Sequence, residues 1–428
     1  MERTDILYQQ YIAILEEELR PAMGCTEPIA LAYAAAKARA VLGIIPQRVE
    51  ARVSGNIIKN VKSVVVPNTG GLRGIAAAIC AGIIAGDAEK ELQVISAVSD
   101  AQRAALKDYL SNTKIDISPS PSDLIFDIDL TLYAENGEIS RVRIINHHTN
   151  IVLVQKNDEI LLELPVAESS EDHLTDKSCL SIEKIVEFAD CLDVEDIRPC
   201  IGRQIEYNMA IAMDGIENNW GANIGSVILK HQGMSLEKRA CAYAAAGSDA
   251  RMSGCEKPVI ILSGSGNQGI TASVPVVIVA REMGASEDEL LRAVVVSDLV
   301  TIHQKTGIGR LSAYCGAISA GCGAGAGIAY LRGGRFHAVA HTVVNAIAIL
   351  SGTICDGAKP SCAAKIAAAV DAGILGYDMY LENQQFYGGD GIVTKGVDKT
   401  VVNVGRLARE GMRETDKTIL EIMLSDGC

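Results

Sequence analysis

Four cysteines near the C-terminal end have a spacing that could serve metal chemistry. Cys315 and Cys322 are seven residues apart, as are Cys355 and Cys362. This spacing places two thiols on one face of a helix or at the ends of a short loop. Structural zinc sites usually have about two to four residues between paired cysteines, so zinc fits poorly, whereas iron–sulfur clusters tolerate wider spacings. Free cysteines are also among the most buried residue types, and spacing alone favours small core thiols.

A further cysteine, Cys25, lies in the segment 24–28 (GCTEP), directly before an Ala-rich stretch that predicts a helix from Ile29 to about Leu42. Thr26 is a suitable N-cap, with an acidic residue and a proline in the first turn. A thiol at the positive end of a helix is expected to have a lowered pKa, which would make Cys25 a base or nucleophile near neutral pH. The neighbouring Glu27 would instead raise that pKa. A buried core thiol is the alternative.

A glycine-rich turn follows the apolar run 259–262, and its residues 263–269 match the G-x-G-x-x-G pattern of dinucleotide-binding proteins. That fold also needs a long helix after the turn and then a second strand ending in an acidic residue. Pro275 is predicted to interrupt the helix, and the region where the second strand should lie is polar, so we disfavour a Rossmann fold. The turn could hold a substrate carboxylate through its N–H groups and through Ser265 and Asn267. A flexible connector between helices is an equal alternative.

The composition restricts the class of protein. The chain has 39 Lys and Arg against 53 Asp and Glu, a net charge of −14, which argues against binding to nucleic acid or to an anionic membrane. Residues 311–331 and 336–355 lack charged side chains, but their glycines, histidines and asparagine favour buried core helices over membrane spans. The first twenty residues lack the apolar core of a signal peptide. We therefore expect a cytoplasmic homo-oligomer whose twelve cysteines stay reduced.

Hydrophobic periodicity predicts three parts. Residues 1–46 form N-terminal helices, the second of which carries the Cys25 segment. Residues 47–176 form an α+β domain with two β-hairpins, 124–133 with 139–145 and 151–155 with 160–164. Residues 177–428 show helical patterns almost throughout and predict an all-α domain. The predicted fold class is α+β, with the active site in the cleft between the mixed and the helical domain.

Two N-terminal motifs carry a resemblance to a known family. Met23–Pro28 (MGCTEP) and Val66–Gly71 (VPNTGG) resemble the L-cysteine desulfidases, and the similarity covers nearly the whole chain. From about Ile182 onward the chain is also similar, more distantly, to the α-chain domain of iron–sulfur L-serine dehydratases. The residues that carry this second similarity are Ser265–Gly269, Cys315 before a small-residue helix, and Thr353–Asp356 followed by Cys362.

The resemblance implies a cofactor and its ligands. In the dehydratases three cysteines hold a [4Fe–4S] cluster, and this role transfers to Cys315, Cys355 and Cys362. The last two cysteines are closer together here than in the dehydratases, a glycine stands where those proteins have a proline region, and Cys322 could replace Cys315. The terminal Cys428 could act as a removable fourth ligand, although a free chain end is more often exposed.

The resemblance also implies a reaction: an iron–sulfur lyase of cysteine catabolism that breaks L-cysteine into pyruvate, ammonia and sulfide. The dehydratases carry a Ser-Ser-His-Thr segment near the catalytic centre, and residues 24–27 take that place here, which favours cysteine over serine as substrate. Cys25 is the expected base for the α-proton. The expected substrate-binding residues are Thr26, Asn68, Thr69, Ser265 and Asn267.

Other functions stay open from sequence. They are an L-serine dehydratase-like deaminase, a non-catalytic iron–sulfur sensor and a zinc hydrolase. A pyridoxal phosphate enzyme is less favoured, because no phosphate-binding loop is paired with a convincing lysine.

Overall fold

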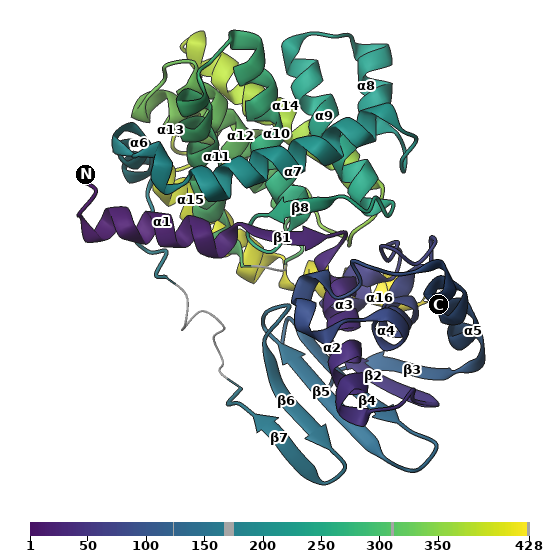
Figure 1. Cartoon of the computed structure of the whole chain (residues 1–428). Helices are drawn as coiled ribbons and strands as arrows, with labels where there is room; N and C mark the ends of the chain where they lie inside the picture. The colour runs from purple at the N-terminus through teal and green to yellow at the C-terminus, as the bar shows by residue number, and fades with distance from the viewer. Residues whose placement is uncertain (123, 167–174, 310–311, 426–428) are drawn as a thin grey trace.

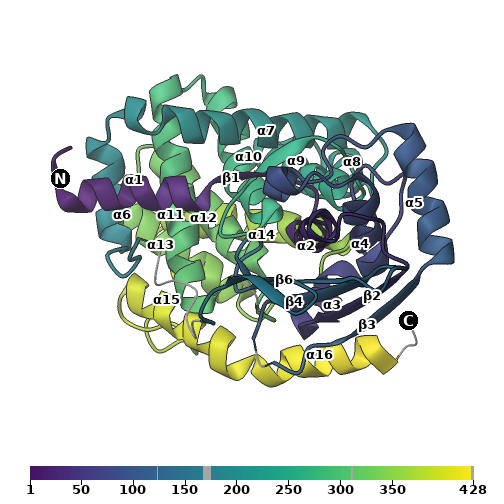
Figure 2. The same cartoon turned by 60° about the horizontal axis from the view of Figure 1, so that its bottom comes forward.

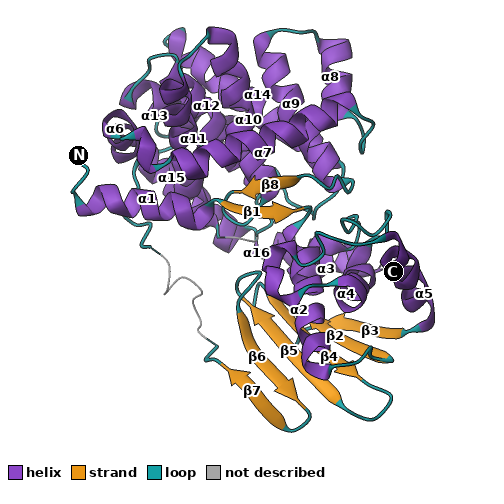
Figure 3. Cartoon of the chain, in the orientation of Figure 1, coloured by secondary structure: helices purple, strands orange, loops and turns teal. Residues whose placement is uncertain are grey.

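The computed structural model describes residues 1–122, 124–166, 175–309 and 312–425, and these form two hydrophobic cores (Figure 1). We call the larger part the helical body and the smaller part the sheet lobe (Figure 3). The helical body contains α1 (Ile6–Glu18), α6 (Ile182–Cys191), α7 (Arg198–Glu217), α8 (Ile224–Gln232), α9 (Leu236–Met252), α10 (Gly266–Met283), α11 (Glu287–Ile308), α12 (Gly316–Leu331), α13 (Phe336–Leu350), α14 (Ser361–Leu381) and α15 (Val397–Arg406).

Helix α12 lies at the centre of the helical body and packs against α10, α11, α13 and α14. Its small residues permit this close packing. A Cβ atom at Gly321 would overlap the carbonyl of Ala369 on α14, and one at Gly325 would overlap the carbonyl of Gly373 one turn further on. The glycines therefore let the two backbones approach closely, at the cost of helix propensity.

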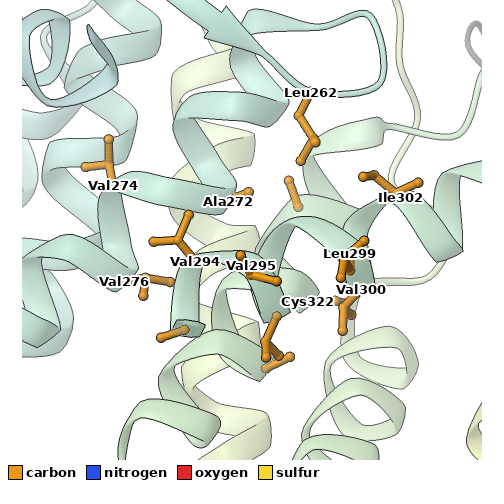
Figure 4. Close-up of a cluster of buried hydrophobic side chains, with 14 of the residues drawn as sticks. Leu262, Ala272, Val274, Val276, Val294, Val295, Leu299, Val300, Ile302 and Cys322 are labelled. Atoms are coloured by element: carbon orange, nitrogen blue, oxygen red, sulfur yellow. The ribbon is translucent and has the colours of Figure 1, made fainter. Parts of the chain in front are cut away.

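The core beside α12 is made of aliphatic side chains from α10 and α11. Figure 4 shows Val294, Val295, Leu299 and Val300 of α11 in the same cluster as Cys322. Close-packed apolar side chains of this kind supply most of the driving force for folding. The helical body is thus a rigid support for residues at the ends of its helices.

The sheet lobe contains one six-stranded sheet with helices packed against it. Its strand order is β3-β2-β4-β5-β6-β7, with β2 and β3 parallel and the other pairs antiparallel. The strands are β2 (Arg48–Val53), β3 (Lys114–Pro119), β4 (Asp127–Tyr133), β5 (Ile139–Ile145), β6 (Ile151–Lys156) and β7 (Glu159–Glu163), and the helices are α2 (Thr26–Leu42), α3 (Gly55–Val61), α4 (Gly74–Ala85) and α5 (Asp100–Asn112).

The residues of strand β4 explain which face of the sheet is buried against the helices. Ile128, Leu130 and Leu132 are fully buried, and α2 packs against β4, β5 and β6. The alternate residue Asp129 lies on the other face, where it forms a bidentate ion pair with Arg141 of β5, at 2.8 and 2.6 Å. Alternation of apolar and charged residues with a period of two fixes which face meets the helices.

A strand pairing and the C-terminal helix both connect the sheet lobe to the helical body. Strand β1 (Arg20–Met23), just before α2, pairs antiparallel with β8 (Pro258–Ile261), just before α10. At the other end of the chain, α16 (Arg413–Ser425) leaves the helical body and lies along α3, as Figure 2 shows. There Lys62 Nζ donates a 2.6 Å hydrogen bond to the carbonyl of Met423.

The predicted fold class is confirmed: an N-terminal part with a sheet precedes a helical C-terminal part. Both predicted hairpins are present, as β4–β5 and β6–β7. Strand β3 and helices α3 and α5 were not predicted, because these segments are short or largely polar. The three-part division at residues 46 and 176 stays a prediction, although α1 packs in the core of the helical body and α2 in that of the sheet lobe.

Two local predictions were wrong. Cys25, not Thr26, is the N-cap residue of α2, which begins at Thr26. Helix α10 also continues through Pro275, although proline removes one backbone hydrogen bond. Pro275 is fully buried among apolar neighbours, and tertiary packing there outweighs the local penalty.

The structure agrees with two exclusions. Strand β8 pairs only with the antiparallel β1 in the part of the chain described, so the glycine-rich turn does not belong to a parallel dinucleotide-binding sheet. None of the described helices is long and apolar enough to cross a membrane.

Candidate active site

A polar cavity lies between the sheet lobe and the helical body. Its volume is about 110 Å³, on the scale of a small ligand, since a cavity of roughly 150 Å³ holds benzene. From the helical body it is lined by residues of α9, by the starts of α10, α12 and α14, and by the segment 355–358. The sheet-lobe residues that line it are Cys25, Thr26, Glu27, Asn56, Lys59 and Asn60.

Three of the predicted cluster cysteines line this cavity. Cys315 is the N-cap of α12, and Cys362 is in the first turn of α14. Backbone bonds hold Cys315 beside Cys355: the Cys315 N–H donates to Thr353 O at 3.0 Å, and the Cys355 N–H donates to Ala313 O at 2.6 Å. Three residues that are distant in sequence are thus brought to one wall.

The electrostatics of these thiols reflect how close they lie. The pKa of Cys315 is raised to about 12, mainly by burial and then by the negative charges of Cys355 and Cys362, while Lys365 acts in the opposite direction. Burial also raises the pKa of Cys362, and the Cys355 charge adds to that rise. Clustered thiols of this kind are unfavourable as free thiolates unless a cation neutralises them.

The donor set fits an iron–sulfur cluster better than a single ion. Among the described residues, no three His, Cys, Asp or Glu side chains are arranged to hold one metal ion. An iron–sulfur cluster has a different requirement, because each cysteine thiolate binds a separate iron atom. Cys315, Cys355 and Cys362 line one cavity, and Lys365 acts electrostatically on two of them, so these are the residues that would hold such a cluster.

Cys322 does not line the cavity. It lies on α12 two turns after Cys315, with an exposed fraction of 1%, and Figure 4 shows it among the aliphatic side chains of α11. Of the two alternatives for the ligand on this helix, Cys315 is the one that faces the cavity. Cys428 lies outside the described residues.

Cys25 lines the cavity from the sheet lobe. Its side chain is 3% exposed, and its Sγ lies 3.0 Å from Glu27 Oε2 as hydrogen-bond donor. The expectation of a lowered pKa was wrong. Burial raises the pKa of Cys25 well above its ordinary value and the charge of Glu27 raises it further, while Arg251 only partly opposes them. The helix N-terminus is too weak to offset a buried carboxylate in contact.

Glu27 is a buried carboxylate with three hydrogen-bond partners. Asn60 Nδ2 donates to Oε1 at 3.0 Å, and the Thr26 hydroxyl lies 3.1 Å from Oε2, the oxygen that Cys25 also contacts. Burial opposes ionisation, yet the pKa of Glu27 is lowered, because the charge of His148 and the Cys25 hydrogen bond stabilise the carboxylate. The side chain is therefore an ionised acceptor inside the protein.

Arg251 and the turn before α10 form the next part of the wall. Arg251 is 3% exposed, and its Nη1 donates to Asn267 Oδ1 at 3.1 Å. A Cβ atom at Gly266 would overlap Arg251 Nε, so a larger residue there would displace the guanidinium. Ser265 is the N-cap of α10 and makes no side-chain capping bond. The glycine-rich turn thus brings an N-terminal helix end and a buried guanidinium to the same place.

Several polar atoms of the cavity wall have no partner. Within the described residues, these buried atoms lack a hydrogen bond: Asn56 Oδ1, Arg251 Nε, Gln268 Oε1 and Tyr314 Oη. Burying a polar group without a partner costs free energy. Four such atoms around one cavity indicate a site that is built to receive a polar ligand.

The cavity favours negative charge although the chain is acidic. Lys59, Arg251 and Lys305 line it, against Glu27 as the acidic lining residue among those described. Helices α2, α10, α12 and α14 also begin at this cavity, and helix N-termini attract anions. Such a site suits a thiolate-bound cluster or a substrate carboxylate.

Lys59 is held from outside the cavity. It is 3% exposed and forms an ion pair with Asp416 of α16. A Cβ atom at Gly357 would overlap the carbonyl of Lys59, so the segment after Cys355 packs directly on α3. The C-terminal helix thereby helps to position one cation of the cavity.

Two predicted substrate-binding residues are not among the lining residues. Asn68 Nδ2 donates to Ile95 O at 2.8 Å, and Thr69 Oγ1 donates to Val66 O at 2.7 Å, so both side chains stabilise local backbone. Their motif still has a structural role at the site. Gly24 has a left-handed φ of 60°, and a Cβ atom there would overlap Pro67, so the two N-terminal motifs pack on each other.

Sequence reasoning missed several lining residues. Asn56, Lys59 and Asn60 recur at helical spacing in an otherwise apolar stretch, and this pattern could have revealed them. Gln268 lies in the glycine-rich turn that was already singled out. Arg251 and Lys305 carry no local signal, because only the tertiary fold brings them to the cavity.

Comparison with known proteins places the chain in a class. The family model described as serine dehydratase alpha chain matches residues 89–421, and the chain belongs to this family. The sequence analysis placed the start of the similarity to the dehydratases at about Ile182. The match begins well before that residue, so it also covers most of the sheet. The family indicates a lyase.

Individual relatives cover the full chain. A UPF0597 protein of Desulfitobacterium hafniense is 59% identical over 99% of both chains. UPF0597 proteins of Treponema denticola and Lachnoclostridium phytofermentans are 46% and 47% identical, each over 98% of this chain and over 98% and 100% of their own length. The chain is thus similar to these proteins from end to end.

Proposed function

We propose that the protein is an iron–sulfur-dependent lyase that breaks L-cysteine into pyruvate, ammonia and sulfide. The observation that carries the proposal is the composition of one cavity. Three clustered thiols, Cys315, Cys355 and Cys362, line it from the helical body, and a fourth thiol, Cys25, lines it from the sheet lobe. Membership of the serine dehydratase alpha-chain family supports elimination from a small amino acid.

Cys315, Cys355 and Cys362 would hold a [4Fe–4S] cluster. When bound by three protein thiolates, such a cluster supplies an open iron site that acts as a Lewis acid toward the departing β-substituent. The protein contributes the thiols, the four helix N-termini that favour negative charge, and the cavity between the sheet lobe and the helical body.

Arg251 is the residue that we assign to the substrate carboxylate. Its guanidinium is buried, its Nε is without a partner, and Asn267 holds its other end. Arginine binds a carboxylate through two parallel N–H bonds. Ser265 and Thr26 lie on the same cavity and can contribute hydroxyl groups to the substrate. Asn68 and Thr69 are left out of this set because their side chains bind backbone.

Cys25 is the residue that we assign to the α-proton. It belongs to the sheet lobe and lines the same cavity as the three clustered thiols of the helical body. A base at that position can remove the α-proton while the β-substituent leaves on the other side. The aminoacrylate that results hydrolyses in water to pyruvate and ammonia.

L-Serine is the second candidate substrate, because the family description names serine dehydratase. The two substrates differ only in the β-substituent, so the assigned roles of Arg251 and Cys25 would apply to both. The proposal of cysteine rests on the segment 24–27, which stands where the resemblance expects Ser-Ser-His-Thr.

The deciding experiment is anaerobic purification followed by parallel assays with L-cysteine and L-serine. Sulfide and pyruvate in equal amounts from L-cysteine support the proposal. Pyruvate from L-serine at a much higher kcat/KM would make the protein a serine dehydratase. Brown protein without turnover on either amino acid would favour a sensor, and colourless zinc-containing protein a zinc hydrolase.

A further inference from the structure

We propose that Glu27 is a catalytic residue that accepts the thiol proton of Cys25, so that the two side chains act as one proton-transfer pair. The inference rests on the proposed function and adds the group that receives the proton that Cys25 must release. Cys25 Sγ and Glu27 Oε2 lie 3.0 Å apart, and both residues line the cavity.

The surroundings of Glu27 fix the carboxylate in position for this transfer. Asn60 on α3 donates to Oε1, which leaves Oε2 directed toward Cys25 and the Thr26 hydroxyl. Thr26 Oγ1 is also 3.2 Å from Gly264 O, so it can turn its proton toward either acceptor. Asn60 and Thr26 therefore hold the carboxylate in place beside Sγ, one at each oxygen.

The resting protonation state shows why a partner is needed. Burial and then the charge of Glu27 raise the pKa of Cys25, and the pKa of Glu27 is lowered despite burial by His148, Cys25 and Arg251. The resting pair is thus a neutral thiol beside a carboxylate. A neutral thiol cannot take a proton from the substrate until it has released its own.

Each proton and electron pair in this transfer has a source and a destination. The Cys25 S–H bond breaks, its proton passes to Glu27 Oε2, and the electron pair remains on Sγ. The thiolate then forms a new S–H bond with the α-proton, the Cα–H electron pair becomes the Cα=Cβ bond, and the Cβ–S pair leaves with hydrosulfide. The hydrosulfide is released into the cavity that Glu27 also lines, Glu27 returns its proton to it there, hydrogen sulfide departs, and the resting pair is restored.

This assignment differs from a merely structural role for Glu27. A structural carboxylate would only bind Asn60 and anchor the start of α2. Its loss would reduce stability and, because an adjacent negative charge is removed, speed alkylation of Cys25, but it would not slow turnover. A proton acceptor must instead be needed for turnover, so its loss slows the reaction although the thiol itself becomes more reactive. The two roles separate by experiment.

The first measurement needs neither substrate nor cluster. Alkylation of Cys25 by iodoacetamide is followed by mass spectrometry in full-length, cluster-free protein. Residues 4–37 form the tryptic peptide, because Pro21 blocks cleavage after Arg20, and Cys25 is its only cysteine. Glu27→Gln removes the adjacent negative charge, so we expect the Cys25 alkylation rate near pH 8 to rise about tenfold. Asp298→Asn, which replaces another fully buried carboxyl outside the lining residues, is the control for a buried acid-to-amide change and should leave the rate unchanged.

The second measurement is turnover of cluster-containing protein. Glu27→Gln should keep wild-type iron content and lose about 100-fold in kcat. The double variant Cys25→Ser/Glu27→Gln should be no slower than Cys25→Ser alone, because residues that act as a unit are not additive. If Glu27→Gln does not fold, Glu27→Asp keeps the charge but withdraws the oxygen, and its kcat should fall at least about tenfold with iron retained.

An unchanged alkylation rate in Glu27→Gln, or wild-type kcat in a folded Glu27 variant, would overturn the pair. A wild-type protein that is inactive on both amino acids, but whose Glu27→Gln variant shows the faster alkylation, would instead overturn the proposed function and leave the coupling of the two side chains supported.

Discussion

The two walls of the cavity carry thiols beside charged neighbours of opposite sign, although burial raises the pKa of the thiols on both walls. On the helical-body wall, Lys365 acts on Cys315 and Cys362 with its positive charge. On the sheet-lobe wall, Cys25 contacts the carboxylate of Glu27. A cation favours thiolates, which are the form that binds metal, whereas an adjacent anion favours the neutral thiol. The residue type alone therefore does not tell a ligand from a proton-transfer group.

Lys365 is held near these thiols by its own hydrogen bonds. Burial opposes its charge, but the pKa of Lys365 is raised, because Asp356 accepts a 2.6 Å hydrogen bond from its Nζ and Cys315 and Cys362 add their negative charges. Its Nζ also donates to Ile354 O at 2.9 Å. The lysine thus ties the segment around Cys355 to helix α14, the same segment that the cluster would span.

The largest effect is expected when the helical-body wall loses a thiol. Cys355→Ser should abolish the brown colour and bound iron of anaerobic protein and lower turnover by about 1,000-fold or more, because a Lewis acid supplies several kcal/mol to the reaction. Iron content and the visible spectrum measure this. Cys322→Ala is the matched control, since Cys322 lies in the apolar core, and it should keep its iron. Full iron in the Ser variants of Cys315, Cys355 and Cys362 alike would refute the ligand assignment.

The next effect concerns the sheet-lobe wall. Cys25→Ser should retain wild-type iron while kcat falls by about 100-fold, because the hydroxyl is a far weaker acid than the thiol and cannot be deprotonated by Glu27. Iron content and kcat measured on the same preparation separate the two walls. A Cys25→Ser protein that loses its iron would show that Cys25 is a ligand and that the contrast between the walls is wrong.

A smaller effect is expected at Arg251, which lies in the helical body but acts electrostatically on Cys25. Arg251→Lys keeps the charge and loses the bidentate fork, so KM should rise about tenfold with a smaller change in kcat. Steady-state kinetics with the amino acid substrate provide the measurement. Arg52→Lys, at an exposed position of β2, is the control and should behave as wild type. An unaltered KM in Arg251→Lys would remove Arg251 from carboxylate binding.

The smallest effect is expected at the ion pair that supports the sheet-lobe wall from outside. Asp416→Asn leaves the buried Lys59 charge without its partner and should lower the free energy of unfolding by about 1 to 3 kcal/mol. Urea denaturation measures this. Glu414→Gln on the same helix removes an exposed ion pair with Lys417 and should change nothing measurable. Equal stability of the two variants would mean that α16 does not hold Lys59.

Much of the fold could be predicted because it follows from local patterns. The alternation in β4 and β5 and the turn between them define a hairpin, and the Gly/Ala run of α12 defines a buried helix. Strand β3 escaped prediction because it is a largely exposed edge strand, and its parallel pairing with β2 joins residues more than sixty positions apart. Such pairing leaves no trace in a local window.

Sequence motifs singled out some residues that line the candidate site and others that do not. Cys25, Ser265, Asn267 and the three clustered cysteines could be singled out from motifs, and all of them line the cavity. Asn68 and Thr69 belong to an equally clear motif, but they stabilise a turn that packs against Gly24. A motif therefore marks a conformational requirement as readily as a chemical one.

The sequence by itself determined the fold class, the helix ends that carry Cys25 and Cys315, and the set of thiols available for chemistry, because these depend on residue type and local spacing. Only the tertiary structure decided the protonation of those thiols. Burial and contacts between distant segments set the local electrostatics, and they place Glu27 beside Cys25 and Lys365 near Cys315. The pKa of a buried group is set by neighbours that the chain brings together only after it has folded.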